Sequence, residues 1–158
     1  MSQTYEVILE TVEAEPMAAV SARANFAGLS RAIPSGLDKV YAVLRAGQVE
    51  PLGCNVVFYL PFDDKADFDL RIGVRLATPF AATDEVKLFE TPAGLVAHVV
   101  YFGDYGHMKP AHDAIHQWVS AQGHKLTGAS WEVYGDWSDD PTQLRTDIYY
   151  QLKGDARG

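Results

Sequence analysis

The sequence has a single cysteine, no long hydrophobic run and no cluster of basic residues. Cys54 has no second cysteine with which to form an internal disulfide, which suits a reducing compartment. No window approaches the roughly 20 consecutive apolar residues of a transmembrane helix, and the N-terminus lacks the basic and apolar segments of a secretory signal peptide. The sequence therefore predicts a cytoplasmic protein that does not span a membrane.

Several chemistries lack the residues they would need. The chain carries 13 Lys and Arg against 21 Asp and Glu, a net charge of −8, and no basic stripe that could follow a phosphate backbone. Neither a Gly-rich phosphate loop nor the Gly-x-Ser-x-Gly elbow of serine hydrolases is present. We therefore expect no direct nucleic acid binding and no cofactor, while a cationic partner is compatible with the charge.

The composition is that of an ordinary globular domain. With 158 residues, 47% of them hydrophobic and 22% charged, the chain is long enough to bury a core without a metal or disulfides. Short β-prone runs separated by turn residues predict eight strands. These are residues 4–12, 17–24, 54–60, 68–76, 85–90, 95–102, 130–134 and 144–153, with turns expected at 13–16 and 91–94.

Two helices are predicted, one in each half of the chain. The first is expected to begin after a loop, with Ser35 as N-cap and Asp38 three residues later, and to end at Gly47. The second begins at Pro110. In both, apolar residues recur at the i, i+3, i+4, i+7 spacing of one helix face: Leu37, Val40, Tyr41 and Leu44 in the first, Ala111, Ala114, Ile115 and Trp118 in the second.

The two halves repeat the same order of elements with a nearly constant offset. Ile8 corresponds to Leu88, Leu44 to Trp118 and Ile72 to Ile148, with offsets of 80, 74 and 76. We interpret the chain as one α+β domain of tandem β-α-β-β units, repeat one at about residues 4–77 and repeat two at about 84–153. Neither unit can bury both faces of its sheet alone. We therefore expect a curved antiparallel sheet with two helices and a central pocket at the pseudo-two-fold axis.

Glu132 lies in a strand that alternates large and polar side chains. If the face of Trp131 and Val133 packs on the core, Glu132 and Tyr134 share the opposite face. There, Glu132 either meets solvent or an arginine, or it lies in a pocket. In the simplest register Tyr149 joins Glu132, while the other face of that strand, Thr146, Ile148 and Tyr150, belongs to the core.

Other residues allow more than one interpretation. Val57 and Tyr59 are the repeat equivalents of Glu132 and Tyr134, so Tyr59 is a candidate for the opposite pocket wall, although core packing explains it equally well. His112 and His116 have metal-ligand spacing but no third ligand, and a solvated helix face is the favoured interpretation, so no metal site is predicted. Cys54 is expected to be a small buried side chain.

The second half resembles the GyrI-like, or AraC-type effector-binding, small-molecule-binding domain in its stand-alone form. The matching segments are residues 97–99, Tyr101-Phe102-Gly103-Asp104-Tyr105, the helix ending in Trp118 before Gly123, residues 131–134, and residues 144–149. The resemblance implies an aromatic-lined pocket with one glutamate at its centre, which maps onto Glu132. It further implies that multidrug-binding members recognise lipophilic cations through this residue. The first half departs from the pattern around Phe26, where no Gly-x-Tyr turn is found.

Three functions follow as hypotheses. The first is a binding protein that senses or sequesters an apolar, cationic or aromatic ligand through Glu132, Tyr134, Tyr149, Tyr101, Tyr59 and Val57. The second is a hydrolase of small electrophiles with Glu132 as general acid or base, which requires a carboxyl pKa raised by burial. The third is docking on a protein partner, a transcription regulator or a topoisomerase, by analogy with the family.

Overall fold

The computed structural model describes residues 5–24, 28–49, 51–61, 68–76, 82–83, 85–104, 107–135 and 139–153. Each half of the chain has the same order of elements, two strands, one helix and two more strands. The predicted α+β class, with two helices and antiparallel strands, is confirmed. The chain divides into two compact units, Met1–Val12 with Ala93–Gly158 (unit 1) and Glu13–Pro92 (unit 2).

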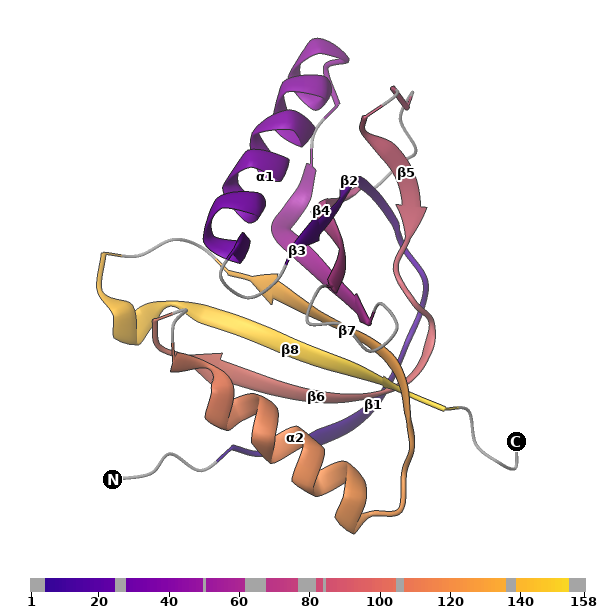
Figure 1. The fold of residues 1–158 in the computed structure, drawn as a ribbon, viewed down its shortest axis with the longest axis vertical. Coiled ribbons are helices and arrows are strands. Elements are labelled where there is room, and N and C mark those ends of the chain that lie inside the picture. The colour runs from indigo at the N-terminus through magenta and orange to yellow at the C-terminus, as the bar shows by residue number, and fades with distance from the viewer. Residues whose placement is uncertain are drawn as a thin grey trace. The chain divides into compact units, whose positions relative to one another are not determined.

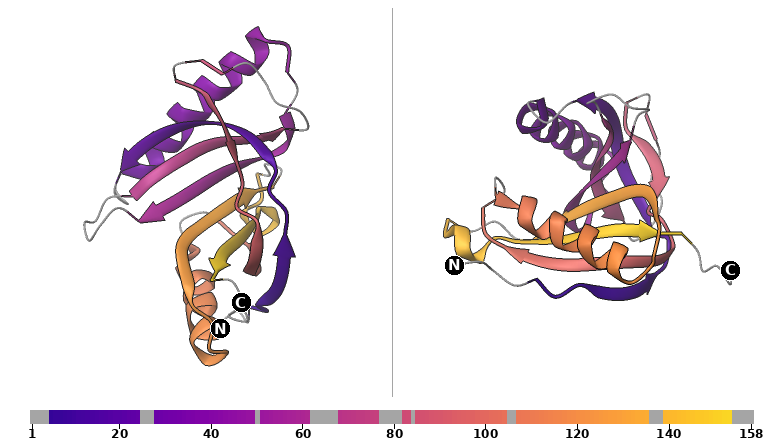
Figure 2. Two further views of the ribbon diagram at one scale, coloured as in Figure 1. Left: turned by 90° about the vertical axis from the view of Figure 1, so that its right-hand side faces the viewer. Right: turned by 60° about the horizontal axis from the view of Figure 1, so that its bottom comes forward.

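Unit 1 is a four-stranded antiparallel sheet with one helix on one face (Figure 1). Its strands are arranged in the order β1 (Ile8–Val12), β6 (Gly94–Phe102), β8 (Arg145–Leu152) and β7 (Leu126–Tyr134). Helix α2 (Lys109–Ala121) crosses β6 and β8 (Figure 2) and buries Ala111, Ile115 and Val119 against the sheet. A single 3-10 turn, η3 (Pro141–Gln143), precedes β8.

Unit 2 repeats this arrangement. Its strands are arranged in the order β3 (Pro51–Pro61), β4 (Phe68–Leu76), β2 (Pro16–Ala24) and β5 (Lys87–Glu90). Helix α1 (Leu29–Ala46) packs closely enough that a Cβ on Gly36 would lie 2.9 Å from a methyl group of Val20 and 3.0 Å from one of Ile72. Those two residues therefore mark the sheet face that the helix covers, and Val57, paired with Ile72, shares it.

The connections expected as turns at 13–16 and 91–94 do not form hairpins. β1 pairs with β6 and β5 pairs with β2, so each edge strand joins the sheet of the other repeat. Near the two connections, the Thr91 amide donates to the Glu15 carbonyl and the Glu15 amide donates to Thr91 Oγ1, both at 2.8 Å. Local turn residues alone do not decide strand pairing, because a hairpin and an exchanged strand satisfy the same backbone groups.

The first helix differs from its prediction at the N-terminal end. It begins at Leu29 rather than at Ser35, and Pro34 lies inside it on an exposed position. A proline removes one backbone donor, but packing of the amphipathic face on the sheet supplies most helix stability in proteins. The predicted end at Gly47 is confirmed, with its amide donating to the Val43 carbonyl.

Burial and strand register give the repeat correspondence at the level of single residues. Among the side chains that the structure describes, the buried positions of α1 are Gly36, Val40 and Leu44, and those of α2 are Ala111, Ile115 and Val119, a constant offset of 75. Leu44 therefore corresponds to Val119 rather than to Trp118. Ile72 faces Val57 across the β3–β4 pair, and Ile148 faces Glu132 across the β7–β8 pair. The predicted equivalence of Val57 and Glu132 is confirmed.

Some predictions concern residues that are not described. The side chain of Cys54, the acidic segment at residues 136–138 and Tyr105 lie outside the described residues. Within the described part of the chain, no helix is long and apolar enough to cross a membrane.

Candidate functional site: a buried glutamate held by histidine and tyrosine

Glu132 is buried on the face of the unit 1 sheet that α2 covers, with 5% of its surface exposed. Its carboxylate accepts a hydrogen bond from the Tyr134 hydroxyl at 2.5 Å, and His112 Nε2 on α2 lies 2.9 Å from its other oxygen. His112 Nδ1 in turn lies 2.6 Å from the Tyr150 hydroxyl. Four side chains from β7, β8 and α2 thus form one hydrogen-bonded network around a carboxylate, which we call the Glu132 network.

The direction of these hydrogen bonds follows from the chemistry of the groups. Burial, together with the negative charges of Glu132 and Asp113, raises the pKa of Tyr150 to about 12. The phenol is therefore protonated at neutral pH. With a neutral imidazole, the Tyr150 hydroxyl donates to His112 Nδ1 and His112 Nε2–H donates to Glu132. The carboxylate is held in one orientation by a chain that starts at Tyr150.

The structure corrects the prediction for His112. Its side chain is only 24% exposed and reaches Glu132, so it does not belong to a solvated helix face. His116 is exposed, although its ring contacts the edge of Tyr150 at a centroid distance of 4.9 Å. The predicted buried face of the helix included Ala114 and Trp118, which are only partly buried. The stripe that is actually buried runs beside His112, which is i−3 from Ile115 and i−7 from Val119.

The strand register also changes the tyrosine partner of Glu132. Trp131 faces Tyr149 across the β7–β8 pair, while Glu132 faces Ile148 and Ser130 faces Tyr150. The prediction that Tyr149 shares the face of Glu132 is wrong, and Tyr150 takes that place. The predicted grouping of Tyr150 with buried Thr146 and Ile148 is confirmed, but this face is the one that carries Glu132.

The remaining predicted residues, Tyr101, Val57 and Tyr59, lie at two different places. Tyr101 is buried in the core beneath α2, where its hydroxyl donates to the Asp104 carbonyl at 2.8 Å and burial with nearby Asp104 raises its pKa. Val57 is fully buried on the α1-covered face of unit 2, with half-buried Tyr59 two residues along the same strand. Glu132 and Tyr134 are thus joined directly, and none of the hydrogen bonds of the Glu132 network involves Tyr101.

The repeat provides an internal control for the Glu132 network. The positions that hold His112 and Glu132 in unit 1 hold Leu37 and Val57 in unit 2, by the offset of 75, and Tyr150 corresponds to Val74 by the offset of 76 seen for Ile148 and Ile72. The same scaffold therefore packs with apolar side chains at all three positions. A buried carboxylate is expensive to desolvate, so the fold itself does not require the polar set.

A second polar cluster lies on the opposite face of the unit 1 sheet. His98 is buried between two carboxylates, with Nε2 3.0 Å from Asp147 and Nδ1 3.2 Å from Glu10, the latter without hydrogen-bond geometry. The rings of His98, Tyr149 and Trp131 stack in sequence, with centroid separations of 4.3 and 5.3 Å. The contacts of this cluster join side chains of β1, β6, β8 and β7. We interpret it as a structural cluster, unlike the Glu132 network.

Asp147 should make this cluster sensitive to acid. Its burial opposes ionisation, but hydrogen bonds from His98 and Arg145 outweigh burial and lower its pKa from 3.8 to about 2. Because the folded pKa is below the unfolded one, the stabilisation is complete above about pH 4 and is lost as pH falls through 2. We expect Asp147→Asn to lower the free energy of unfolding by about 1–2 kcal/mol at pH 7.

Urea unfolding at a series of pH values measures this difference. The difference in the free energy of unfolding between wild type and Asp147→Asn should decrease between pH 4 and pH 2. Asp38→Asn, at an exposed position of α1, should have nearly the wild-type free energy of unfolding at every pH. A difference in the free energy of unfolding that stays constant down to pH 2 would contradict the lowered pKa of Asp147.

Comparison with known proteins identifies relatives of the fold. EcmrR in an EcmrR–DNA complex superposes with a TM-score of 0.81 at 18% identity, over 94% of this chain and 57% of the EcmrR chain. The isolated EcmrR C-terminal domain matches with a TM-score of 0.78 at 19% identity, over 96% and 99% of the two chains. This chain thus spans little more than half the length of the full EcmrR chain.

Two further solved structures are related more distantly. A hydrolase from Listeria innocua matches with a TM-score of 0.61 at 14% identity, over 94% of this chain and 92% of its own. SAV2435 bound to tetraphenylphosphonium matches with a TM-score of 0.62 at 13% identity, over 96% and 95%. Among curated protein sequences none matches. Residues 5–153 match the GyrI-like small molecule binding domain, and the chain belongs to that family.

Proposed function

We propose that this protein binds an apolar, cationic or aromatic small molecule through the Glu132 network, and so senses or sequesters it. The observation that supports this proposal is a buried carboxylate set among aromatic and imidazole rings, whereas the other repeat has a valine and a leucine at the positions of Glu132 and His112. A cation that pairs with a desolvated carboxylate gains more than it would at the surface, and each aromatic face adds roughly 0.5–2 kcal/mol.

The neighbours are consistent with this chemistry. SAV2435 was solved with tetraphenylphosphonium, a lipophilic cation, and EcmrR was solved on DNA. For this chain we propose the same class of ligand, with Glu132 as the charge partner and Tyr134 and Tyr150 as aromatic contacts. We further propose that ligand binding is passed on to a protein partner, such as a transcription regulator, and this part of the proposal is supported by family membership alone.

A thermal-shift titration with tetraphenylphosphonium tests the proposal. At 100 times its dissociation constant a ligand stabilises the folded protein by about 2.7 kcal/mol, so the midpoint of unfolding should rise clearly. Glu132→Gln keeps the shape of the side chain and removes its charge, and the shift should disappear. Glu85→Gln, at an exposed position, removes the same charge elsewhere and should leave the shift intact.

Equal responses of wild type and Glu132→Gln would show that any bound cation does not use this carboxylate. A set of lipophilic cations that produces no shift in wild type would overturn the cationic version of the proposal. Binding to a neutral aromatic compound, lost in Tyr150→Ala but kept in Glu132→Gln, would assign the site to aromatic rather than cationic ligands.

We keep hydrolysis of small electrophiles as the second candidate, because the Glu132 network also has the form of a proton relay. Tyr150, His112 and Glu132 are linked in series by contacts of 2.6 and 2.9 Å, within the reach of proton transfer. Glu132 would activate water or protonate a leaving group, with His112 as its positioning residue. Turnover of strained-ring electrophiles, assayed between about pH 5 and 9, distinguishes the candidates. If the compounds bind but no product forms, the hydrolase candidate is rejected and only the binding function is supported.

A further inference from the structure

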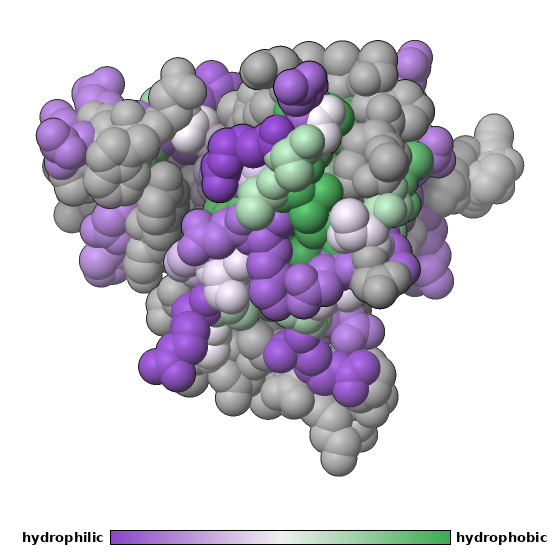
Figure 3. Space-filling model, turned by 90° about the horizontal axis from the view of Figure 1, so that it is seen from above, coloured by the Kyte–Doolittle hydropathy of each residue, from purple (hydrophilic) through white to green (hydrophobic). Residues whose placement is uncertain are grey.

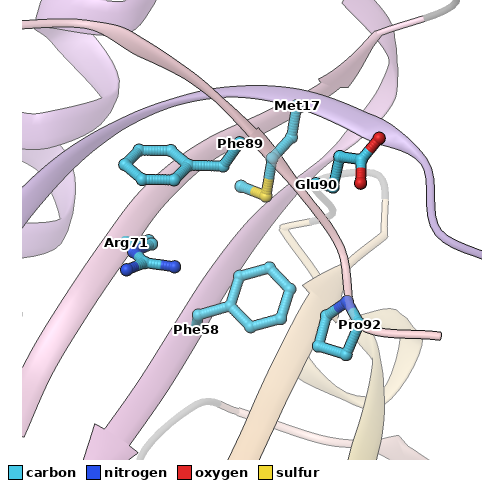
Figure 4. Close-up of a pocket in the computed structure, with 6 residues that line it drawn as sticks. All are labelled: Met17, Phe58, Arg71, Phe89, Glu90 and Pro92. Atoms are coloured by element: carbon cyan, nitrogen blue, oxygen red, sulfur yellow. The ribbon is translucent and has the colours of Figure 1, made fainter.

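We propose that unit 2 carries a second ligand site, for a small carboxylate with a flat apolar body, centred on Arg71. A pocket with about 270 Å³ of empty space, part of it open solvent, is lined by Met17, Phe58, Arg71, Phe89, Glu90 and Pro92 (Figure 4). All six belong to unit 2. The site is therefore distinct from the Glu132 network and does not depend on the function proposed for it.

The strand registers explain why these side chains converge. Arg71 pairs with Phe58 of β3 on one side and with Ser21 of β2 on the other, and Phe89 pairs with Met17. Paired residues of an antiparallel ladder point to the same face. Arg71 is adjacent in sequence to Ile72, which faces α1, so the pocket lies on the sheet face that α1 leaves uncovered.

Arg71 is the residue that specifies an anion. Its guanidinium carbon lies 4.4 Å from the centre of the Phe89 ring, and among the described residues it has no hydrogen-bond or ion-pair partner. Arg23 of β2 and Arg75 of β4, on the same face of the sheet, each pair with a carboxylate, Asp69 and Glu15 respectively. Within the described part of the chain, Arg71 is thus a half-buried arginine stacked on a ring without an anionic partner, and its donors are available for a ligand.

The apolar side chains of the pocket favour a ligand whose carboxylate is attached to a flat apolar group. Met17 and Phe58 are buried and, with Phe89, supply apolar surface beside the guanidinium. Figure 4 shows the Glu90 carboxylate beyond Met17, at the far end of the pocket from Arg71. A planar guanidinium binds a carboxylate with two parallel hydrogen bonds, and a ring or short chain attached to it would lie on the apolar wall. The enclosed part of this space is much smaller than a typical drug-sized site, which limits the ligand to a small molecule.

The exposed apolar side chains give no sign of an extended apolar surface at the pocket. On the face shown in Figure 3, the hydrophobic side chains gather in one area, with hydrophilic side chains on part of its border. Among the described residues the large apolar side chains that are exposed are Ile8, Leu9, Leu88 and Phe102, and none of them lines the pocket. A small-molecule site therefore accounts for the pocket better than a broad protein-docking surface.

Benzoate is a suitable probe, with benzamide as its neutral analogue of the same shape. Ligand-observed NMR on the full chain should show benzoate binding with a dissociation constant of about a millimolar, and benzamide binding at least about tenfold more weakly. Arg71→Gln should weaken benzoate at least about tenfold, and Arg71→Lys should restore only part of the affinity, since a lysine lacks the planar fork. Arg45→Gln, exposed on α1, is the matched control and should bind as wild type.

Glu132→Gln separates this site from the other one. It should leave benzoate affinity unchanged, whatever its effect on tetraphenylphosphonium. Equal binding of benzoate and benzamide, or wild-type benzoate affinity in a folded Arg71→Gln protein, would overturn the proposal. Loss of benzoate binding in Glu132→Gln would also overturn it, because the carboxylate would then be binding elsewhere. Circular dichroism establishes that each variant is folded.

Discussion

Converting the Glu132 network into its unit 2 counterpart is expected to abolish cation binding while keeping or raising stability. The variant combines His112→Leu and Glu132→Val, as at Leu37 and Val57, with Tyr150→Phe to remove the hydroxyl that contacts His112. Replacing a buried charged network by well-packed apolar residues is often neutral or stabilising, by about 1–4 kcal/mol. The free energy of unfolding in urea should therefore stay the same or increase.

The single substitution should behave in the opposite way. His112→Leu alone removes the donor to one oxygen of the buried carboxylate, and an unsatisfied buried partner costs about 1–3 kcal/mol. The triple variant should then be more stable than the single one, a non-additivity that a mutant cycle measures directly. A triple variant that is less stable than His112→Leu would show that the network is structural.

This comparison bears on function because it separates two reasons for keeping the polar residues. If the triple variant is stable and does not bind tetraphenylphosphonium, the network is retained for a ligand. If it is stable and still binds, the ligand site lies elsewhere. Val57→Ala, which removes volume from the apolar equivalent, is the control for packing alone and should destabilise by about 1–3 kcal/mol.

Replacing Gly73 by alanine is expected to unfold or severely destabilise unit 2. An added Cβ at Gly73 would lie 2.7 Å from the Ala19 Cα and still closer to the Ala18 carbonyl oxygen, both in the backbone of the paired strand β2. Backbone atoms in a ladder cannot move away as a flexible side chain can. We therefore expect a loss of more than about 3 kcal/mol, above the usual range for overpacking.

Gly47→Ala is the matched control, because its nearest contact would be 3.6 Å and its φ of −91° suits any residue. The free energy of unfolding, measured by thermal denaturation, should therefore change by less than about 1 kcal/mol in Gly47→Ala. A Gly73→Ala protein with wild-type unfolding would mean that β2 and β4 can separate locally. In that case the positions of Met17 and Arg71 in the pocket would not depend on the close approach at Gly73.

The periodic parts of the fold follow directly from the residues. Strand β4 is predicted to the residue, and the end of α1 at Gly47 is correct. The start of α1 is wrong because a proline suggests a boundary locally, whereas the buried stripe through Gly36, Val40 and Leu44 is a tertiary property. The exchange of β1 and β5 between sheets was not predictable, since pairing depends on distant strands.

The candidate site shows the same division. Alternation along β7 is enough to place Glu132 and Tyr134 on one face, and the repeat is enough to match Glu132 with Val57. Choosing between Tyr149 and Tyr150 requires the β7–β8 register, because a shift of one residue moves every side chain to the other face. From Ser130 to Tyr134 the β7–β8 ladder keeps one register, which places Glu132 opposite Ile148 and Ser130 opposite Tyr150.

Periodicity and local order along the chain were enough to predict the duplicated α+β scaffold and a single glutamate where the other repeat has a valine, and the motifs of the second half carried the family resemblance. Three features appear only in the folded structure: Glu132 lies beneath a helix, His112 and Tyr150 hold it, and Arg71 lies over Phe89 in a separate pocket. Each of those depends on which face of an element meets a distant neighbour. Hydrogen bonds between side chains 20 or 38 residues apart leave no periodic trace along the chain.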